Sequence, residues 1–283
     1  MINLFCKRLA QTLTLVLLTS TSVVGQIAFS PTILFMSDEK PVNELLIRNV
    51  TDVPQEVEFI ERFGYPVRTP SGTLEMVYDD SISVAQHGLT GMLRIFPGKA
   101  LIPPRSQQIV RLQVIKNGGE NDQVYWTRLG IESRAVEMST HDLNSDKDSP
   151  ELSYLFRQNI GVYYKHGHVH TGVVFNGIEK VDDGENIRLL ISASRTGNSP
   201  YLGIMTARIT NSDERVVSES EQVVNLFFDS TFSVSVDREK VKPGPYKLDI
   251  TFETTRGDVP EEQLVKYPIQ KFSTEFFIQE QAN

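Results

Sequence analysis

The stretch Glu151–Lys165, ELSYLFRQNIGVYYK, has the alternation of an extended strand. Every second residue from Leu152 onward lies on one face of such a strand, and these residues are Leu152, Tyr154, Phe156, Gln158, Ile160 and Val162. The stretch directly follows the polar run Ser139–Pro150, which has the composition of a solvated loop. A long apolar strand beside such a loop is at risk of being a sheet edge.

The chain before this stretch consists of short β-rich runs separated by Pro, Gly, Asn and Asp, without a long stretch of helical period. Val, Ile, Thr and aromatic residues in such runs favour strands, and their close spacing indicates a β-sandwich. The predicted strands are Ile27–Met36, Asn43–Asn49, Gln55–Arg62, Ile109–Ile115 and Val124–Glu132.

The second half of the chain also consists of short β-rich runs separated by turn residues, with turns predicted at Asn211–Asp213 and Lys242–Pro245. Its predicted strands are Ile187–Ser194, Ile204–Thr210, Gln222–Phe228, Thr231–Val236, Tyr246–Glu253 and Lys271–Gln279. We expect two domains, 26–165 and 166–283, that divide near Lys165–His170, where the sequence KHGHVH ends the apolar strand.

The first 25 residues have the pattern of a secretory signal peptide, with Lys7 and Arg8 before the apolar run Leu13–Leu18 and cleavage expected after Gly25. Cleavage would remove Cys6, the single cysteine, so we expect a mature protein without disulfides.

The net charge of −8 would become −10 on cleavage, because the removed segment contains two basic residues and no acidic residue. No later segment has the roughly 20 apolar residues that a membrane span needs. The scattered basic residues argue against nucleic acid as a partner.

Five segments of the first half resemble the periplasmic pilus-assembly chaperones, the PapD-like family. They are Phe29–Phe35 with its Ser-Pro-Thr, Leu45–Val53 (LLIRNVTDV), Leu93–Val114 (LRIFPGKALIPPRSQQIVRLQV), Gln123–Ile131 (QVYWTRLGI) and Ile160–Lys165 (IGVYYK). Their order and spacing carry the resemblance, which covers roughly Ile27–Lys165.

The resemblance implies an all-β chain of two immunoglobulin-like β-sandwich domains in a boomerang arrangement. It also implies a use for the edge, because the last strand of the family's first domain is inserted into the groove of an incomplete pilin. The client-binding strand would then carry Leu152, Tyr154, Phe156 and Ile160. Its partners would be pilin-like or other β-rich subunits and an outer-membrane usher-like assembly protein. The alternative is that the stripe faces the domain's own core.

The sequence departs from the family at the pair of basic residues that binds the client's carboxylate, because Ile33 and Gly161 stand at those positions. A buried carboxylate needs such partners. The candidates for a displaced anchor are Arg157, Lys165 and Arg128, although the ordinary role of such residues, a solvated surface cation, is favoured for each.

Little in the sequence points to enzyme chemistry, so we expect neither catalysis nor a cofactor. No P-loop, G-x-S-x-G, H-E-x-x-H or dinucleotide motif occurs. His166, His168 and His170 alternate and could share one face of an extended segment, which gives a weak candidate metal site. Trp126, in mid-strand, is predicted to be core packing.

Three functions therefore stay open from the sequence. The favoured one is a periplasmic chaperone that lends its strand to β-rich subunits for delivery to an outer-membrane assembly platform. A second is a structural or adhesive surface protein of two immunoglobulin-like domains without a client. A third is a metalloenzyme that uses the three histidines.

Overall fold

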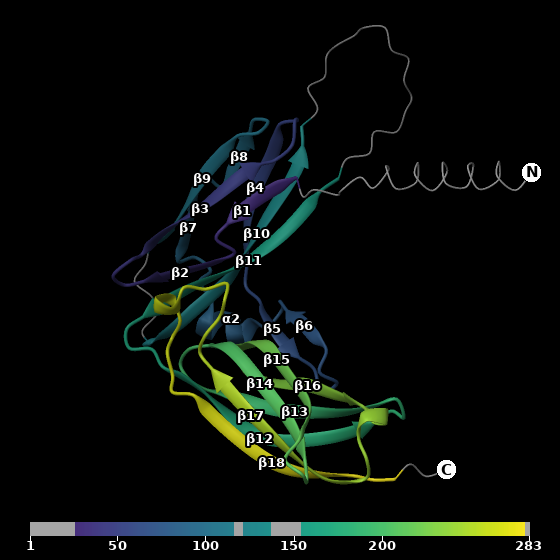
Figure 1. Ribbon diagram of the computed structural model, residues 1–283. Helices are drawn as coiled ribbons and strands as arrows, with labels where there is room; N and C mark the ends of the chain where they lie inside the picture. Colours follow the sequence, from purple (N-terminus) through teal and green to yellow (C-terminus); the bar gives the residue numbers. More distant parts are fainter. Residues whose placement is uncertain (1–25, 116–120, 137–153, 281–283) are drawn as a thin grey trace, which may run out of the picture.

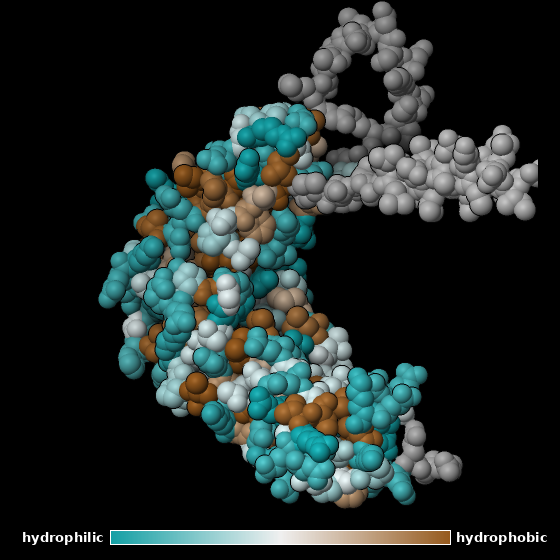
Figure 2. Space-filling view, viewed as in Figure 1, coloured by the Kyte–Doolittle hydropathy of each residue, from teal (hydrophilic) through white to brown (hydrophobic). Residues whose placement is uncertain are grey.

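The computed structural model describes residues 26–115, 121–136 and 154–280. These residues form two β-sandwiches that meet at an angle, so that the molecule is hollowed on one side (Figures 1 and 2). The predicted all-β, two-sandwich class is confirmed. The expected signal peptide, residues 1–25, and the whole polar run Ser139–Pro150 lie outside the described residues, as does Leu152. Within the described part, no helix has the length and apolar character to cross a membrane.

The first sandwich packs a four-stranded sheet, in the order β1-β3-β9-β7, against a five-stranded sheet, in the order β2-β11-β10-β4-β8. The strands are β1 (Ile27–Ser30), β2 (Ile33–Ser37), β3 (Val42–Asn49), β4 (Gln55–Arg62), β7 (Leu93–Phe96), β8 (Lys99–Ile102), β9 (Gln107–Val114), β10 (Gln123–Ala135) and β11 (Phe156–His166). Alternate residues of both sheets fill the core between them, including Leu45, Val110, Leu129 and Val162, which are fully buried.

The predicted strand Ile27–Met36 is in fact two strands in different sheets. β1 pairs with β3, and β2 pairs in parallel with β11. Pro31 stands between them, and proline has no backbone N–H to donate to a ladder. The chain therefore leaves one sheet at Ser30 and enters the other at Ile33.

An excursion between β4 and β7 reaches across to the second sandwich. It contains the hairpin of β5 (Tyr65–Arg68) and β6 (Leu74–Val77), followed by the helix α2 (Ser81–His87). The side chain of Asp80 caps the helix by accepting a hydrogen bond from the Ser83 N–H. No strand or helix was predicted here, because segments this short carry little periodicity.

The second sandwich packs the sheet β12-β13-β16 against the sheet β15-β14-β17-β18. Its strands are β12 (Thr171–Asp182), β13 (Asn186–Gly197), β14 (Tyr201–Asn211), β15 (Val216–Leu226), β16 (Asp229–Asp237), β17 (Gly244–Glu253) and β18 (Gln270–Ile278), with short 3₁₀ turns at η1 (Arg238–Lys240) and η2 (Glu261–Gln263). Strand β12 was not predicted, because a bulge between Phe175 and Gly177 interrupts its alternation.

A third apolar cluster lies between the two sandwiches. Aromatic residues of the first sandwich, among them Phe63, Tyr65 and Trp126, pack against Phe227 and Leu202 of the second. The Trp126 ring lies 5.0 Å from the Phe227 ring, and the Tyr65 ring 4.9 Å from the Phe228 ring. Trp126 is 1% exposed, so the prediction of core packing holds, although the packing joins two sandwiches rather than filling one.

Candidate functional site

Strand β11 is paired along its whole length on one flank and along only half of it on the other. Its antiparallel pairing with β10 runs from His166 opposite Gln123 to Phe156 opposite Ser133. On the other flank, β2 pairs only with Gly161–Lys165. Within the described part of the chain, no strand pairs with this second flank over Phe156–Ile160. Figure 1 shows β11 running along the hollowed side of the upper lobe.

The apolar face of β11 changes from buried to exposed along the strand. Ile160, Val162 and Tyr164 belong to the core of the first sandwich. Phe156 lies on the same face but is 36% exposed, and Tyr154, just before the strand, is 59% exposed with its ring centroid 6.4 Å from that of Phe156. The exposed end of the stripe is therefore a pair of neighbouring aromatic side chains.

Ile160 is a correction to the predicted client-binding set. Its side chain is 1% exposed and packs within the first core, so it is not available to a partner. The alternation that placed it with Tyr154 and Phe156 is real, but the core ends between Ile160 and Phe156. Periodicity identifies the face of a strand, and only the tertiary packing decides how far along that face the core extends.

The opposite face of the five-stranded sheet is turned toward the second sandwich. Gly161, Tyr163 and Lys165 of β11 lie on this face, because they alternate with the core residues. Tyr163 is 5% exposed and belongs to the cluster between the sandwiches, where its ring stacks 5.0 Å from that of Phe35. Burial raises the pKa of the Tyr163 hydroxyl, and the nearby guanidinium of Arg128 offsets part of that rise.

Four residues form a row across this face: Ile33, Gly161, Arg128 and Arg62. Ile33 pairs with Gly161, Gly161 with Arg128, and Arg128 with Arg62. The two positions where a basic pair was expected are thus direct neighbours, and Arg128 is the next residue along the row. The Nε of Arg128 is buried and has no hydrogen-bond partner among the described residues.

The Tyr163 side chain, from the same strand, fills the space beside the Gly161 Cα. A Cβ at this position would lie 2.9 Å from the Tyr163 ring and 3.3 Å from its hydroxyl oxygen. The Tyr163 ring therefore takes the space where a longer side chain at position 161 would stand. Arg128 lies opposite Gly161 in the register, at the end of the open flank, and its charge acts on the Tyr163 hydroxyl.

The other two candidate cations lie on the same face but in different surroundings. Arg157 forms an ion pair with Glu132, with its Nε 2.6 Å from the Glu132 Oε1, so its charge already has a partner on the surface. Lys165 is half-buried, with its Nζ 5.7 Å from the Phe35 ring centroid, and burial lowers the pKa of its ammonium. It borders a cavity of about 300 Å³ but stands four residues from Gly161, roughly 13 Å along the strand.

The three alternating histidines do not converge. The His166 Nδ1 lies 2.8 Å from the Asp38 Oδ1, whereas the rings of His168 and His170 stack on each other at 6.3 Å. Among the described residues, no group of three or more His, Cys, Asp or Glu is arranged to hold a metal ion. Gly167, with a φ of +61°, turns the segment and breaks the extended geometry that the weak metal prediction assumed.

Some residues of this face carried no sequence signal. Arg62 sits at the end of an ordinary strand, with its guanidinium 4.2 Å from the Tyr78 ring centroid. Tyr163 is one of two adjacent tyrosines in the sequence, and only the pairing register shows that it leans over Gly161.

Comparison with known proteins gives likenesses only among solved structures. No protein-family model matches the sequence, and no curated protein matches it. The YadV chaperone is 10% identical, with 89% of this chain and 100% of that chain covered at a TM-score of 0.48. The CupB2 chaperone of Pseudomonas aeruginosa is 9% identical, with 88% and 98% covered at 0.40. The SafB chaperone of Salmonella enterica, in complex with the SafA pilin, is 8% identical, with 89% and 98% covered at 0.41. All three are structures of chaperones, and the SafB structure also contains a pilin.

Proposed function

We propose that the chain is a periplasmic chaperone that holds a β-rich subunit on the open flank of β11. The observation that carries the proposal is the half-paired edge, at which no strand among the described residues lies beside Phe156–Ile160 on one side. A docked strand would form main-chain hydrogen bonds with these residues. No covalent bond is made or broken in this function, so it requires no catalytic residue.

The exposed aromatic pair would supply the side-chain contacts. Tyr154 and Phe156 stand at the open end of the strand and would enter an apolar groove of the partner. Moving a large apolar side chain from water into such a groove contributes roughly 1.5–3 kcal/mol for each residue. Together with the main-chain ladder, these contacts account for selective binding of partners whose own sheet lacks a strand.

The flank also limits which part of a partner can bind. A strand added beside Phe156–Ile160 lies in line with β2, which occupies the same flank from Gly161 onward. The added strand must therefore end or turn away at Gly161. If it runs parallel to β11, the end that meets β2 is its C-terminus.

The charge near this point favours a carboxylate. Arg128 lies across Gly161, and no carboxylate pairs with it among the described residues. A guanidinium and the Tyr163 hydroxyl together would donate hydrogen bonds to the two oxygens of a chain end. Arg128 would thus replace the basic pair that the family has at positions 33 and 161. Transfer of the bound subunit to an outer-membrane assembly protein would complete the role.

The test compares two matched variants in the native periplasm. Replacing Tyr154 and Phe156 together by Ser is expected to abolish co-purification of the client while leaving the thermal unfolding midpoint unchanged. The control is Leu155→Ser, because Leu155 is equally exposed at 58% but points to the other face. Retained co-purification in the double variant, or equal loss in the control, would reject the proposal.

A further inference from the structure

His87 lies inside the aromatic cluster that joins the two sandwiches. It is the last residue of α2, and its ring stacks on that of Trp126 with centroids 4.7 Å apart and planes 16° apart. On its other side, the ring of Phe228 lies 5.8 Å away. Trp126 belongs to the first sandwich and Phe228 to the second, so the imidazole bridges the two bodies.

The hydrogen bonds around His87 assign its neutral tautomer. The Gln123 Nε2 donates to the Gln86 carbonyl oxygen at 2.6 Å, which turns the Gln123 Oε1 toward the imidazole. That oxygen lies 2.9 Å from the His87 Nδ1 and can only accept. The Nδ1 therefore carries the proton of the neutral ring, and the Nε2 is the atom that takes up a second proton on acidification.

The charged groups around the ring offer a protonated imidazole little support. From β13, the Arg195 guanidinium lies over Phe228 at 5.6 Å and repels a second positive charge. From the start of α2, Asp80 is already bound by the Ser83 hydroxyl at 2.6 Å and the Tyr65 hydroxyl at 2.7 Å. The residues that touch the ring from β10 and from the segment before β16 are uncharged.

These surroundings set the direction of titration. Burial is the largest effect and lowers the pKa of the His87 imidazole; the hydrogen bond to Gln123 offsets part of that fall, Arg195 lowers the pKa further, and Asp80 raises it by the smallest amount. The face of Trp126 attracts a cation, yet this gain is smaller than the loss of hydration.

We propose that His87 is an acid-sensitive latch between the two sandwiches. The neutral ring fits between Trp126 and Phe228 and holds the sandwiches at a fixed angle. A protonated ring must either stay desolvated beside Arg195 or withdraw into water, and withdrawal leaves only the direct contacts of Trp126 with Phe227 at 5.0 Å and Phe228 at 6.1 Å to hold this part of the junction. Acidification therefore opens the hollow between the lobes, and this effect does not depend on whether the chain is a chaperone.

The difference in the His87 pKa between the closed and open arrangements determines how the stability of the closed arrangement changes with pH. An imidazole that has left the cluster titrates near 6.5, and one inside the cluster titrates lower. The closed arrangement is favoured above that value. It loses stability as the pH falls through 6.5 toward the pKa of the packed ring, and the loss is complete below that lower value.

Trp126 gives this transition a direct optical signal, because it is the single tryptophan of the chain and touches His87. The experiment titrates the full chain from about pH 8 to about pH 5 while recording indole fluorescence and the radius of gyration by small-angle X-ray scattering. We expect both signals to change with one midpoint below 6.5. We expect His87→Asn, which keeps a donor for Gln123 but cannot be protonated, to lose the change in both.

The matched control is the double variant His168→Asn with His170→Asn, which removes two exposed junction histidines and should keep the wild-type midpoint. Site-resolved NMR titration of the His87 imidazole in the wild type is a second measurement that requires no variant. A His87 midpoint at or above 6.5, a fluorescence change without a change in radius, or persistence of both changes in His87→Asn would overturn the latch.

Discussion

Arg128 of β10 lies directly opposite Gly161 of β11 in their antiparallel pairing. Gly161 has no side chain, so nothing from this cross-strand neighbour obstructs the guanidinium of Arg128. Tyr163 fills part of the space above, and its hydroxyl lies on the same side. A positive charge and a hydroxyl donor are therefore held where the open flank of β11 meets β2.

This relationship predicts the effect of removing the charge. Arg128→Gln is expected to weaken client binding by roughly 10- to 150-fold, since a hydrogen bond to a charged group contributes about 1.5–3 kcal/mol. Isothermal titration with the client obtained by co-purification measures the change. Arg157→Gln is the control, because Arg157 lies on the same face but is already paired with Glu132. Equal losses in the two variants would show that general charge, not position, matters.

Ile160 and Phe156 should separate stability from binding. Ile160→Ala is expected to lower the free energy of unfolding by about 2–5 kcal/mol, because it opens a cavity in a packed core. Phe156→Ala should cost much less stability, since Phe156 is 36% exposed, yet it should weaken client binding. Urea unfolding and client titration measure the two effects. An Ile160→Ala variant as stable as the wild type would mean that the packed core does not extend from Val162 as far as Ile160.

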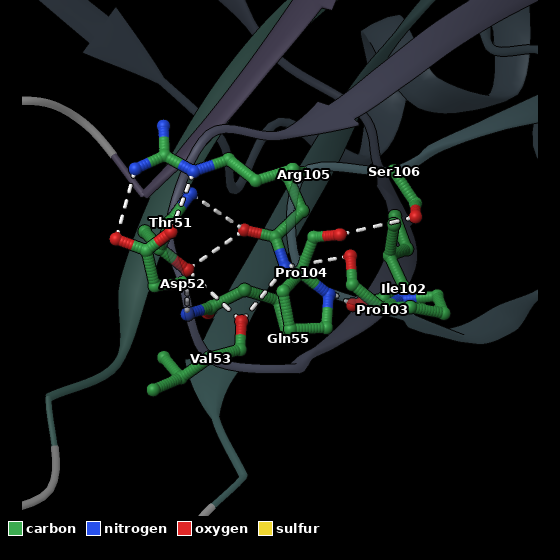
Figure 3. Close-up of polar contacts among 10 residues, drawn as sticks. Thr51, Asp52, Val53, Gln55, Ile102, Pro103, Pro104, Arg105 and Ser106 are labelled. Atoms are coloured by element: carbon green, nitrogen blue, oxygen red, sulfur yellow. Dashed lines mark hydrogen bonds and ion pairs between the residues drawn. The ribbon is translucent and has the colours of Figure 1, made fainter.

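Asn49 is expected to be among the most sensitive polar residues. Its fully buried amide Nδ2 donates to the carbonyl oxygens of Val53, Ile102 and Pro103 at 2.8–3.1 Å, and its Oδ1 accepts from the Thr51 N–H at 2.9 Å. Figure 3 shows the two segments that carry these backbone groups, with Thr51 and Val53 on one and Ile102 and Pro103 on the other. Asn49→Ala should lower the free energy of unfolding by about 3 kcal/mol or more, because several buried groups lose their partners.

The adjacent ion pair provides the control for Asn49. The Arg105 Nε lies 2.7 Å from the Asp52 Oδ1, also visible in Figure 3, but both side chains are exposed to solvent. Asp52→Ala should therefore change the urea midpoint far less than Asn49→Ala. A larger effect for Asp52→Ala would contradict the importance of burial at this end of the sandwich.

Glu61 should make stability depend on pH. Burial raises the pKa of its carboxyl group, and the nearby hydroxyls of Thr127 and Thr90 offset only part of the rise. The folded state thus favours the neutral acid. Stability is highest below the unfolded pKa of about 4.5 and falls as the pH rises through the folded pKa.

The measurement for Glu61 is urea unfolding at several pH values. Glu61→Gln should be more stable than the wild type near pH 7 and should remove this part of the pH dependence. Glu58→Gln is the control, because Glu58 lies on the same strand with an exposed side chain. A wild type that gains stability over the same range would contradict the assignment of the carboxyl group.

Several elements could be predicted because their signal is local. Gln55–Arg62 alternates cleanly, and the strand in the structure has the same bounds. The turn at Asn211–Asp213 follows from the Asn211 side chain, which accepts hydrogen bonds from the N–H groups of Asp213 and Arg215. Strand β12 and the hairpin β5–β6 were missed because a bulge or short length erases the period.

The sequence alone determined that the chain is all-β with two sandwiches, and that an apolar stripe begins at Leu152 and passes through Phe156. Only the tertiary structure decided where on that stripe the core ends, which flank of β11 is open, and that Arg128 faces Gly161. The physical reason is that periodicity depends on neighbours along the chain, whereas edge pairing and cross-strand register depend on segments far apart in sequence. The pairing of Ile33 with Gly161 joins residues of the second and last strands of one sandwich, and no local pattern encodes it.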